Sequence, residues 1–358
     1  MERRREALAA LLHDFPSVEA AFAYGSAVYP QEGSSSSSEL MTDFIFCTDD
    51  AEVWHSDNLC RHPTHYSSLA LGGPRFLAAV QNNLGAGVYY NTLVHVQGHL
   101  IKYGVVESSR LIDDLRHWKF LYLSGRMHKP VLMLRPPSDE LVAAMADNRR
   151  SALAVALLLL PQRFNERELL TQICGMSYGG DVRMGVGENW SKVSRIVAGQ
   201  REHLKQLYSM PLEELKGGLH AGKSAVLSAV LAASDECGGG PRYEQDIGLE
   251  ARRQLLRRIP THVRRELLAE LPRRPSHASP PPSGEGSLLE MEAAVASVWN
   301  TAACAHKANR DLSVALQRSI FRVVRRASLS QTLKGVVTAG PLRSFRYAAT
   351  KISKRLRS

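Results

Sequence analysis

The stretch that decides the fold is residues 22–46, which runs from Phe22-Ala-Tyr-Gly-Ser-Ala-Val28 to Met41-Thr-Asp-Phe-Ile-Phe46. It contains a hydrophobic strand candidate, a Gly25-Ser26 turn, and a second buried strand with one acid near its start. Because glycine has no Cβ, the backbone of this turn and the serine hydroxyl can approach a phosphate. Asp43 offers a hard oxygen ligand for Mg²⁺, which in nucleotide sites needs only one or two carboxylates. The stretch predicts a nucleotide site, although Gly-Ser turns without a ligand are also common.

The composition is that of a folded chain with excess positive charge. Of 358 residues, 44% are hydrophobic and 22% charged, and the formal net charge is +10. This charge favours nucleotides, nucleic acid or anionic lipid as partners, although a generally basic surface gives the same value. The five cysteines include no CxxC pair, which argues against a zinc site or disulfide scaffold and fits a reducing compartment.

The sequence predicts no membrane span and no secretory signal. The longest apolar run, residues 152–160, is about half the ~20 residues that a bilayer requires. The basic start at Arg3–Arg5 is followed by Glu6 and Asp14, which is not typical of a transit peptide.

The first third of the chain predicts a sheet. Strand candidates are Val18–Tyr24 and Phe44–Cys47, and a hairpin is expected at Tyr89–Val96 and His99–Val106 around a Gln97-Gly98 turn. With a helix at 111–121, these strands predict an α+β fold with helices on one face of the sheet. Lys102 lies inside the second hairpin strand, where a lysine either extends to the sheet edge or faces a phosphate.

Residues 138–208 predict helices. Ser138 is positioned to cap a helix over Asp139–Leu159, and Asn165 a helix over Glu166–Cys174. A glycine-rich loop at 175–184 carries Asp181 and Arg183, and Glu188–Tyr208 predicts a third helix. This order suggests a helical, winged-helix-like domain, and the mixed charge of its second helix argues against DNA recognition.

We expect four regions along the chain. The α+β domain with the predicted nucleotide site spans 1–135, and the winged-helix-like domain spans 136–235. A helical C-terminal region at 236–340 contains a Pro/Ser/Gly-rich linker at 273–287, which we expect to be disordered. Residues 341–358 form a basic tail.

The tail predicts an amphipathic helix on a membrane surface. Between residues 341 and 358 there are six basic residues and no acid, and apolar residues recur along one helical face. Each basic residue near anionic lipid adds about 1 kcal/mol to the free energy of membrane binding. Nucleic-acid binding is the competing interpretation of this charge. The residues expected to contact lipid are Arg343, Arg346, Lys351, Lys354 and Arg355.

A histidine cluster at His55, His62 and His65 invites a metal interpretation. The spacing matches neither HExxH nor a zinc finger. Hydrogen bonding within the core or around the substrate is therefore the favoured interpretation.

Eight motifs, in order, together resemble one family. They are Tyr24-Gly-Ser-Ala-Val28, Asp43-Phe-Ile-Phe46, Trp54-His-Ser-x-Asn58, His65-Tyr-Ser67, Gln81-Asn-Asn-x-Gly-Ala-Gly-Val-Tyr-Tyr-Asn91, Leu100-Ile-Lys-Tyr-Gly-Val105, Ser177-Tyr-x-Gly-Asp-x-Arg-Met184 and Lys334-Gly-x-x-Thr-Ala-Gly340. The chain resembles the mitochondrial CDP-diacylglycerol synthase family, also called the translocator assembly and maintenance family. That family belongs to the polymerase-β-like nucleotidyltransferases.

The resemblance implies a polymerase-β-like nucleotidyltransferase domain, then a winged-helix-like domain and a membrane-associating C-terminal segment. It implies that CTP and phosphatidic acid react to CDP-diacylglycerol and pyrophosphate with Mg²⁺, at the matrix side of the mitochondrial inner membrane. The product feeds cardiolipin synthesis, and the anionic membrane surface, rather than nucleic acid, is the expected partner.

The expected site departs from the superfamily pattern. A second acid usually follows two residues after the first on the same strand, where this chain has Ile45. Asp49 has the right parity but lies about 20 Å along the strand. We therefore expect Asp43 to be the only strand carboxylate, with phosphates, water and Asp181 completing the Mg²⁺ shell.

The expected mechanism is in-line attack of a phosphatidate oxygen on the α-phosphorus of CTP. Tyr24, Gly25, Ser26 and Lys102 are expected to bind the nucleotide, and Lys102 and Arg183 to stabilise developing charge. Two alternatives are open. The chain could be an RNA-directed nucleotidyltransferase, or a non-catalytic assembly factor for a membrane translocase.

Overall fold

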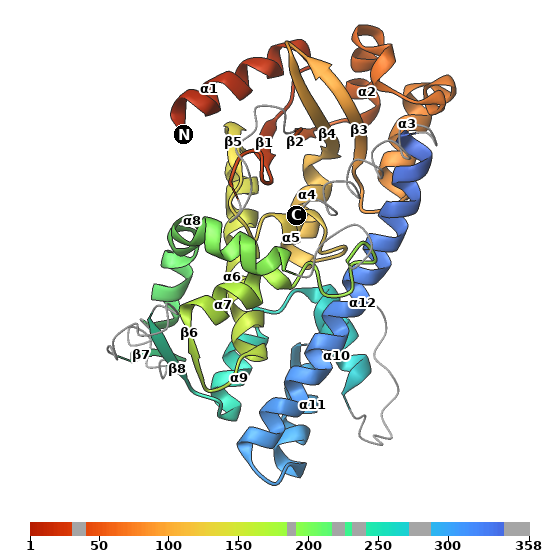
Figure 1. Cartoon of the computed structure of the whole chain (residues 1–358). Coiled ribbons are helices and arrows are strands. Elements are labelled where there is room, and N and C mark those ends of the chain that lie inside the picture. Colours follow the sequence, from red (N-terminus) through yellow and green to blue (C-terminus); the bar gives the residue numbers. More distant parts are fainter. Residues whose placement is uncertain (31–40, 185–190, 217–225, 231–240, 272–287, 340–358) are drawn as a thin grey trace.

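The computed structural model describes residues 1–30, 41–184, 191–216, 226–230, 241–271 and 288–339. A sheet-bearing part and a helical part lie one above the other, and the long helix α12 (Ala305–Ala339) runs along both (Figure 1). The serine-rich loop, the 273–287 linker and the 341–358 tail lie outside the described residues. Among the helices of the described ranges, none has the length and apolarity needed to cross a membrane.

The large sheet is built from five strands in the order β3-β4-β2-β1-β5. The pair of β2 with β4 is parallel, and the other pairs are antiparallel. The strands are β1 (Ala20–Tyr24), β2 (Thr42–Thr48), β3 (Tyr89–Val96), β4 (His99–Glu107) and β5 (Leu132–Arg135). This mixed arrangement of helix and strand confirms the expected α+β class.

Helices cover both faces of this sheet, so the expectation of helices on one face was wrong. Phe44 and Phe46 of β2 pack with Leu8 of α1, whereas Ile45 and Cys47 pack with apolar residues of α4 to α6. Every residue of β1 is buried, so both faces of the sheet must be packed against other elements. The helices of this part are α1 (Glu2–Ala10), α2 (Ala51–Arg61), α3 (Gly73–Asn83), α4 (Ser108–His117) and α5 (Leu123–Arg126), with short 3₁₀ turns at Leu11–Asp14, Pro63–His65 and Ser68–Gly72.

Local sequence signals are confirmed where chain neighbours decide the structure. The β3–β4 turn has positive φ at Gln97 (46°) and Gly98 (78°), as a two-residue hairpin turn requires. Helix α6 (Asp139–Leu159) begins after Ser138, whose side chain accepts from the N–H of Leu141. Helix α7 (Glu166–Gly175) begins with a capping box between Asn165 and Glu168.

The helical part contains a second, three-stranded antiparallel sheet that the sequence did not predict. Strands β6 (Arg163–Asn165), β7 (Leu227–Val230) and β8 (Arg242–Gln245) lie in the order β6-β8-β7. With α6, α7 and α8 (Lys192–Lys216), the chain order is helix, strand, helix, helix, strand, strand, which fits a winged-helix unit. Because β7 pairs with β8, the expected boundary at residue 235 falls between two paired strands.

The C-terminal helices share the core of this unit. They are α9 (Leu249–Leu256), α10 (Thr261–Glu270), α11 (Leu288–Thr301) and α12. One apolar cluster joins Leu157 of α6, Leu204 of α8, Leu255 of α9 and Leu316 of α12. Within the region expected at 236–340, the described helices therefore share one core with the preceding helices.

The C-terminal end of α12 is hydrogen-bonded to the loop between α3 and β3. The Lys334 ammonium donates to the carbonyls of Gln81 (2.9 Å) and Leu84 (2.8 Å) at the C-terminal end of α3. The Gln331 side chain accepts from the N–H of Ala86 (2.8 Å) and donates to the Val88 carbonyl (3.3 Å). Burial lowers the pKa of Lys334 to about 7. These bonds fix the loop that leads directly into β3.

Candidate active site

The Gly25 turn ends β1 beside the Asp43 carboxylate. Gly25 has a φ of +87°, and its carbonyl accepts from the N–H groups of Val28 (3.1 Å) and Tyr29 (2.9 Å). A Cβ on Gly25 would lie 3.3 Å from Asp43 Oδ2. Both the backbone conformation and the space beside the carboxylate therefore favour glycine.

Sheet register brings Asp43 and Lys102 together. Asp43 on β2 is opposite Tyr24 on β1 and opposite Lys102 on β4, so all three lie at one level of the sheet. Lys102 Nζ lies 3.6 Å from Asp43 Oδ1 and 4.4 Å from the centre of the Tyr90 ring. The side chains are 15% exposed for Lys102 and 27% for Asp43. The pair is thus ordered by the sheet yet reachable by a ligand.

Arg126 adds a second cation at this face. Its guanidinium lies 4.5 Å from the centre of the Tyr24 ring. Burial, with the nearby Asp43 charge, raises the pKa of Tyr24 to about 12, so its hydroxyl stays protonated at neutral pH. The cations Lys102 and Arg126, both over tyrosine rings, make this end of the sheet suitable for an anionic ligand.

A buried carboxylate shapes the segment that carries Arg126. Asp114 accepts from the backbone N–H groups of Phe120, Leu121 and Ser124 and from the Ser124 hydroxyl, at 2.8–3.1 Å. These bonds hold the chain between α4 and α5, in which Leu121 has a φ of +50°. The position of Arg126 therefore depends on Asp114, although the two side chains belong to different helices.

A cleft continues from this face towards α12. Tyr90, Tyr122 and Arg126 line it together with Asp181 and Arg183, and the Arg183 guanidinium lies 5.9 Å from the centre of the Tyr122 ring. Further wall residues are Tyr178 of the glycine-rich loop and Val324, Ala327 and Ser328 of α12. The cleft and the Asp43 pair share Tyr90 and Arg126 as neighbours, so Arg183 faces a region adjacent to the sheet site.

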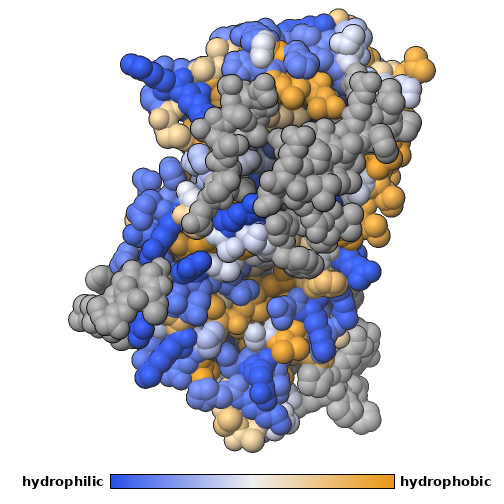
Figure 2. Space-filling model, viewed as in Figure 1, coloured by the Kyte–Doolittle hydropathy of each residue, from blue (hydrophilic) through white to orange (hydrophobic). Residues whose placement is uncertain are grey.

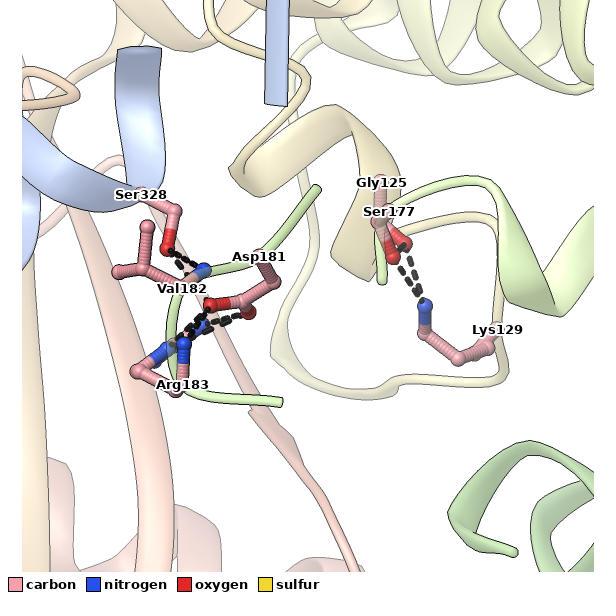
Figure 3. A network of polar contacts seen from close by, with 7 residues as sticks. All are labelled: Gly125, Lys129, Ser177, Asp181, Val182, Arg183 and Ser328. Carbon is pink, nitrogen blue, oxygen red and sulfur yellow. Dashed lines mark hydrogen bonds and ion pairs between the residues drawn. The ribbon is translucent and has the colours of Figure 1, made fainter. Parts of the chain in front are cut away.

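Asp181 is an ion-pair partner of Arg183. Its carboxylate accepts from Arg183 Nε (3.0 Å) and Nη2 (2.6 Å) and from the Ser328 hydroxyl (2.6 Å). Burial alone would raise the pKa of Asp181, but these bonds outweigh it and hold the pKa below its usual value. Figure 3 shows Arg183 and Ser328 converging on this carboxylate from two segments of the chain.

The residues around Asp43 fit a cation shared with phosphates. Across the described ranges, no three His, Cys, Asp or Glu side chains gather as a metal cluster. Mg²⁺ in nucleotide sites uses one or two carboxylates, with phosphates and water as the remaining ligands. The absence of a side chain at Gly25 leaves space beside Asp43 Oδ2 for such a ligand set.

One family model and three related proteins carry the same name. The sequence model of the family described as "Phosphatidate cytidylyltransferase, mitochondrial" matches residues 8–354. Proteins of that name from Xenopus laevis, Danio rerio and Caenorhabditis elegans are 39%, 36% and 35% identical to this chain. The alignments cover 97%, 93% and 100% of this chain and 94%, 89% and 100% of those relatives. The chain belongs to this family.

Family membership confirms the resemblance drawn from the eight motifs, and the structure brings only part of the predicted site together. Tyr24, Gly25, Asp43 and Lys102 meet at one end of the sheet. Ile45 is fully buried in the apolar cluster below, and Asp49 follows the opposite end of β2. Asp43 is thus the one carboxylate of β2, as expected, and Mg²⁺ binding by Asp181 stays a prediction.

Sequence reasoning assigned no role to Arg126, Tyr90 or Ser328. Tyr90 belongs to one of the eight motifs, but an uncharged side chain gave no indication of a role at the site. Arg126 and Ser328 reach the site from segments distant in sequence, and neither has a local pattern that marks a ligand. A tertiary structure was needed to find them.

His55 and His65 join a hydrogen-bond network around Tyr103, whereas the His62 ring bonds to the Asp14 carbonyl at 2.7 Å. His55 is fully buried, and its ring nitrogens lie 2.9 Å from the Tyr66 hydroxyl and 2.9 Å from Gln81 Oε1. The network reaches Tyr103, whose side chain packs on the face of the sheet opposite to Asp43. Burial lowers the pKa of His55 to about 4, so the ring is neutral. These contacts confirm the expected core role of His55.

Gly25→Ala should strongly reduce activity in this family member. Alanine is strained at the positive φ of this position, and its Cβ would approach Asp43 Oδ2. We therefore expect about a tenfold to hundredfold loss in kcat/KM. Gly98→Ala is the matched control, since it has a similar φ (+78°) but open space around it. Equal losses in the two variants would contradict a site-specific role for Gly25.

Proposed function

We propose that this chain transfers CMP from CTP to phosphatidate and releases pyrophosphate, forming CDP-diacylglycerol. Relatives named for this reaction align over nearly the whole chain. The observation that carries the proposal is the Asp43–Lys102 pair beside the Gly25 turn, with Arg126 over Tyr24. A carboxylate for a cation, flanked by two side-chain cations, suits a triphosphate and a second phosphate together.

The proposed reaction is one displacement at phosphorus. A lone pair on a phosphatidate oxygen forms a bond to the α-phosphorus of CTP. The bond from that phosphorus to the oxygen bridging to the β-phosphorus breaks, and pyrophosphate leaves with the electron pair. The attacking oxygen is already ionised, so no strong base is needed, and positioning and electrostatics supply the rate.

Each residue at the site has a proposed task. Gly25 and Ser26 hold the β- and γ-phosphates, and Tyr24 stacks against Arg126 and orients it. Asp43 would hold Mg²⁺, which supplies charge neutralisation on the phosphate oxygens when bound. Lys102 and Arg126 stabilise the charge that develops on the leaving group, and Arg183 does so from the adjacent cleft.

The proposed location is the matrix side of the mitochondrial inner membrane, where the product would feed cardiolipin synthesis. The related proteins are named mitochondrial. Figure 2 has apolar side chains along the edge of the molecule where α3 and the end of α12 lie. Leu71, Leu84, Leu333 and Val337 are large apolar residues exposed in this region. Helix α12 ends at Ala339 and the basic tail follows in the sequence from residue 341, so this surface supports peripheral binding to an anionic bilayer.

Deleting residues 341–358 should weaken binding to anionic liposomes by about tenfold or more, since several basic residues each add about 1 kcal/mol. Sedimentation with vesicles containing phosphatidate, compared with neutral vesicles, measures this. A matched variant would replace Arg343, Arg346, Lys351, Lys354 and Arg355 with glutamine and keep the apolar positions. If the deleted chain bound as well as the full chain, the membrane role of the tail would be wrong.

The function is tested by identifying the product. Full-length chain, CTP and Mg²⁺ are incubated with phosphatidate vesicles or with an RNA oligonucleotide, and products are analysed by mass spectrometry. We expect CDP-diacylglycerol with the lipid and no extended RNA. Extended RNA without lipid product would favour the RNA-directed alternative. No product with either acceptor would favour the assembly factor.

A further inference from the structure

Arg183 lies on a loop, so its position depends on the contacts of its neighbours. Asp181, two residues earlier, accepts from Arg183 Nε and Nη2 and also from the Arg183 backbone N–H at 3.0 Å. This two-point pairing fixes the plane of the guanidinium relative to the carboxylate. The orientation of Arg183 therefore depends on that of Asp181, besides the contact of its guanidinium with the Tyr122 ring at 5.9 Å.

Helix α12 supplies the contact that orients Asp181. The Ser328 hydroxyl donates to Asp181 Oδ1 at 2.6 Å and accepts from the Val182 N–H at 3.3 Å, and Ser328 is 3% exposed (Figure 3). Gly180, with a φ of +93°, lies so close that a Cβ would be 2.6 Å from the Phe321 carbonyl oxygen. The loop is thus packed directly on the α12 backbone at Phe321, two turns before Ser328.

We propose that Ser328 is a positioning residue for the reaction: acting through Asp181, it holds Arg183 against the cleft that Arg126 also lines. The inference rests on the proposed function, because Arg183 contributes only if substrate phosphates bind there. A surface arginine without such support loses considerable side-chain entropy when it binds. The Ser328–Asp181 bond lowers that loss before the substrate arrives.

The same helix also holds the loop that precedes β3. Gln331 and Lys334, one and two turns beyond Ser328, hold the loop that leads into Tyr90. Helix α12 therefore contacts both the loop that carries Arg183 and the loop that ends two residues before Tyr90, and both side chains line the cleft. In this arrangement the C-terminal helix is part of the working site as well as a connection to the tail.

A labelling experiment tests the contact without any enzyme activity. Phenylglyoxal modifies arginine, and mass spectrometry of the peptide containing Arg183 gives its labelling rate. We expect Ser328→Ala to raise this rate about tenfold, the effect of losing one hydrogen bond to a charged group. Ser319→Ala is the control, since Ser319 is also buried on α12 but bonds to Ala315 of its own helix. An unchanged rate in Ser328→Ala, with an unchanged melting temperature, would overturn the inference.

A double-mutant cycle tests the link to catalysis. Ser328→Ala should lower kcat/KM for phosphatidate about tenfold in the wild-type background but less than about twofold when Arg183 is already glutamine. Equal losses in both backgrounds would mean that Ser328 acts independently of Arg183, against the proposal. A wild-type chain without phosphatidate-dependent activity would refute the proposed function and the catalytic task of Arg183, while the labelling would still decide whether Ser328 holds Arg183.

Discussion

Asp43→Asn is expected to lower the rate of CMP transfer by about a thousandfold. The amide keeps the shape of the side chain but removes the charge that a magnesium–triphosphate complex needs beside Gly25. Some loss of stability is expected as well, because Lys102 is only 15% exposed and loses this carboxylate. Rates of CDP-diacylglycerol formation, measured with a melting temperature for each variant, separate the two effects.

Asp49→Asn is the matched control for this prediction. Asp43 lies at the start of β2, and Asp49 is the first residue after the other end of the strand. We expect the control to retain most of its activity. Near-normal transfer by Asp43→Asn, or an equal loss in both variants, would contradict the role assigned to Asp43.

Lys102→Gln should lower kcat by about a hundredfold, the second-largest effect expected. The substitution removes a cation 3.6 Å from the Asp43 carboxylate, where charge on the phosphates develops. Lys216→Gln is a close control, since Lys216 also pairs with a carboxylate, Glu213 at 2.9 Å, and lies over the ring of Tyr243. A Lys102→Gln variant that loses only affinity for CTP, with kcat unchanged, would show that Lys102 binds the ground state alone.

The sequence predicted most elements whose signals are local. The Gln97-Gly98 hairpin turn and the caps at Ser138 and Asn165 depend on residues a few positions apart, and each was found where expected. Strand β8 lacked such a signal, since it is four residues long and pairs with β6 nearly 80 residues earlier. A strand this short has too few residues to show an alternating hydrophobic pattern, and its distant partner gives no local signal.

The site could be predicted only in part, for the same reason. Gly25 and Asp43 stand in one stretch of the chain, so their types and order pointed to phosphate and metal. That Lys102 lies beside Asp43 follows from the parallel register of β2 with β4, which no local pattern encodes. Arg126 and Ser328 depend on the packing of α5 and α12, which tertiary contacts alone decide.

The most direct test of the central claim is pyrophosphate release by the full-length chain with Mg²⁺. CTP, ATP, GTP and UTP are each supplied with and without phosphatidate in liposomes, beside the Asp43→Asn variant. The account predicts release only when CTP and phosphatidate are both present, and its near-complete loss in the variant. Release that is independent of phosphatidate, or none from any nucleotide, would contradict it.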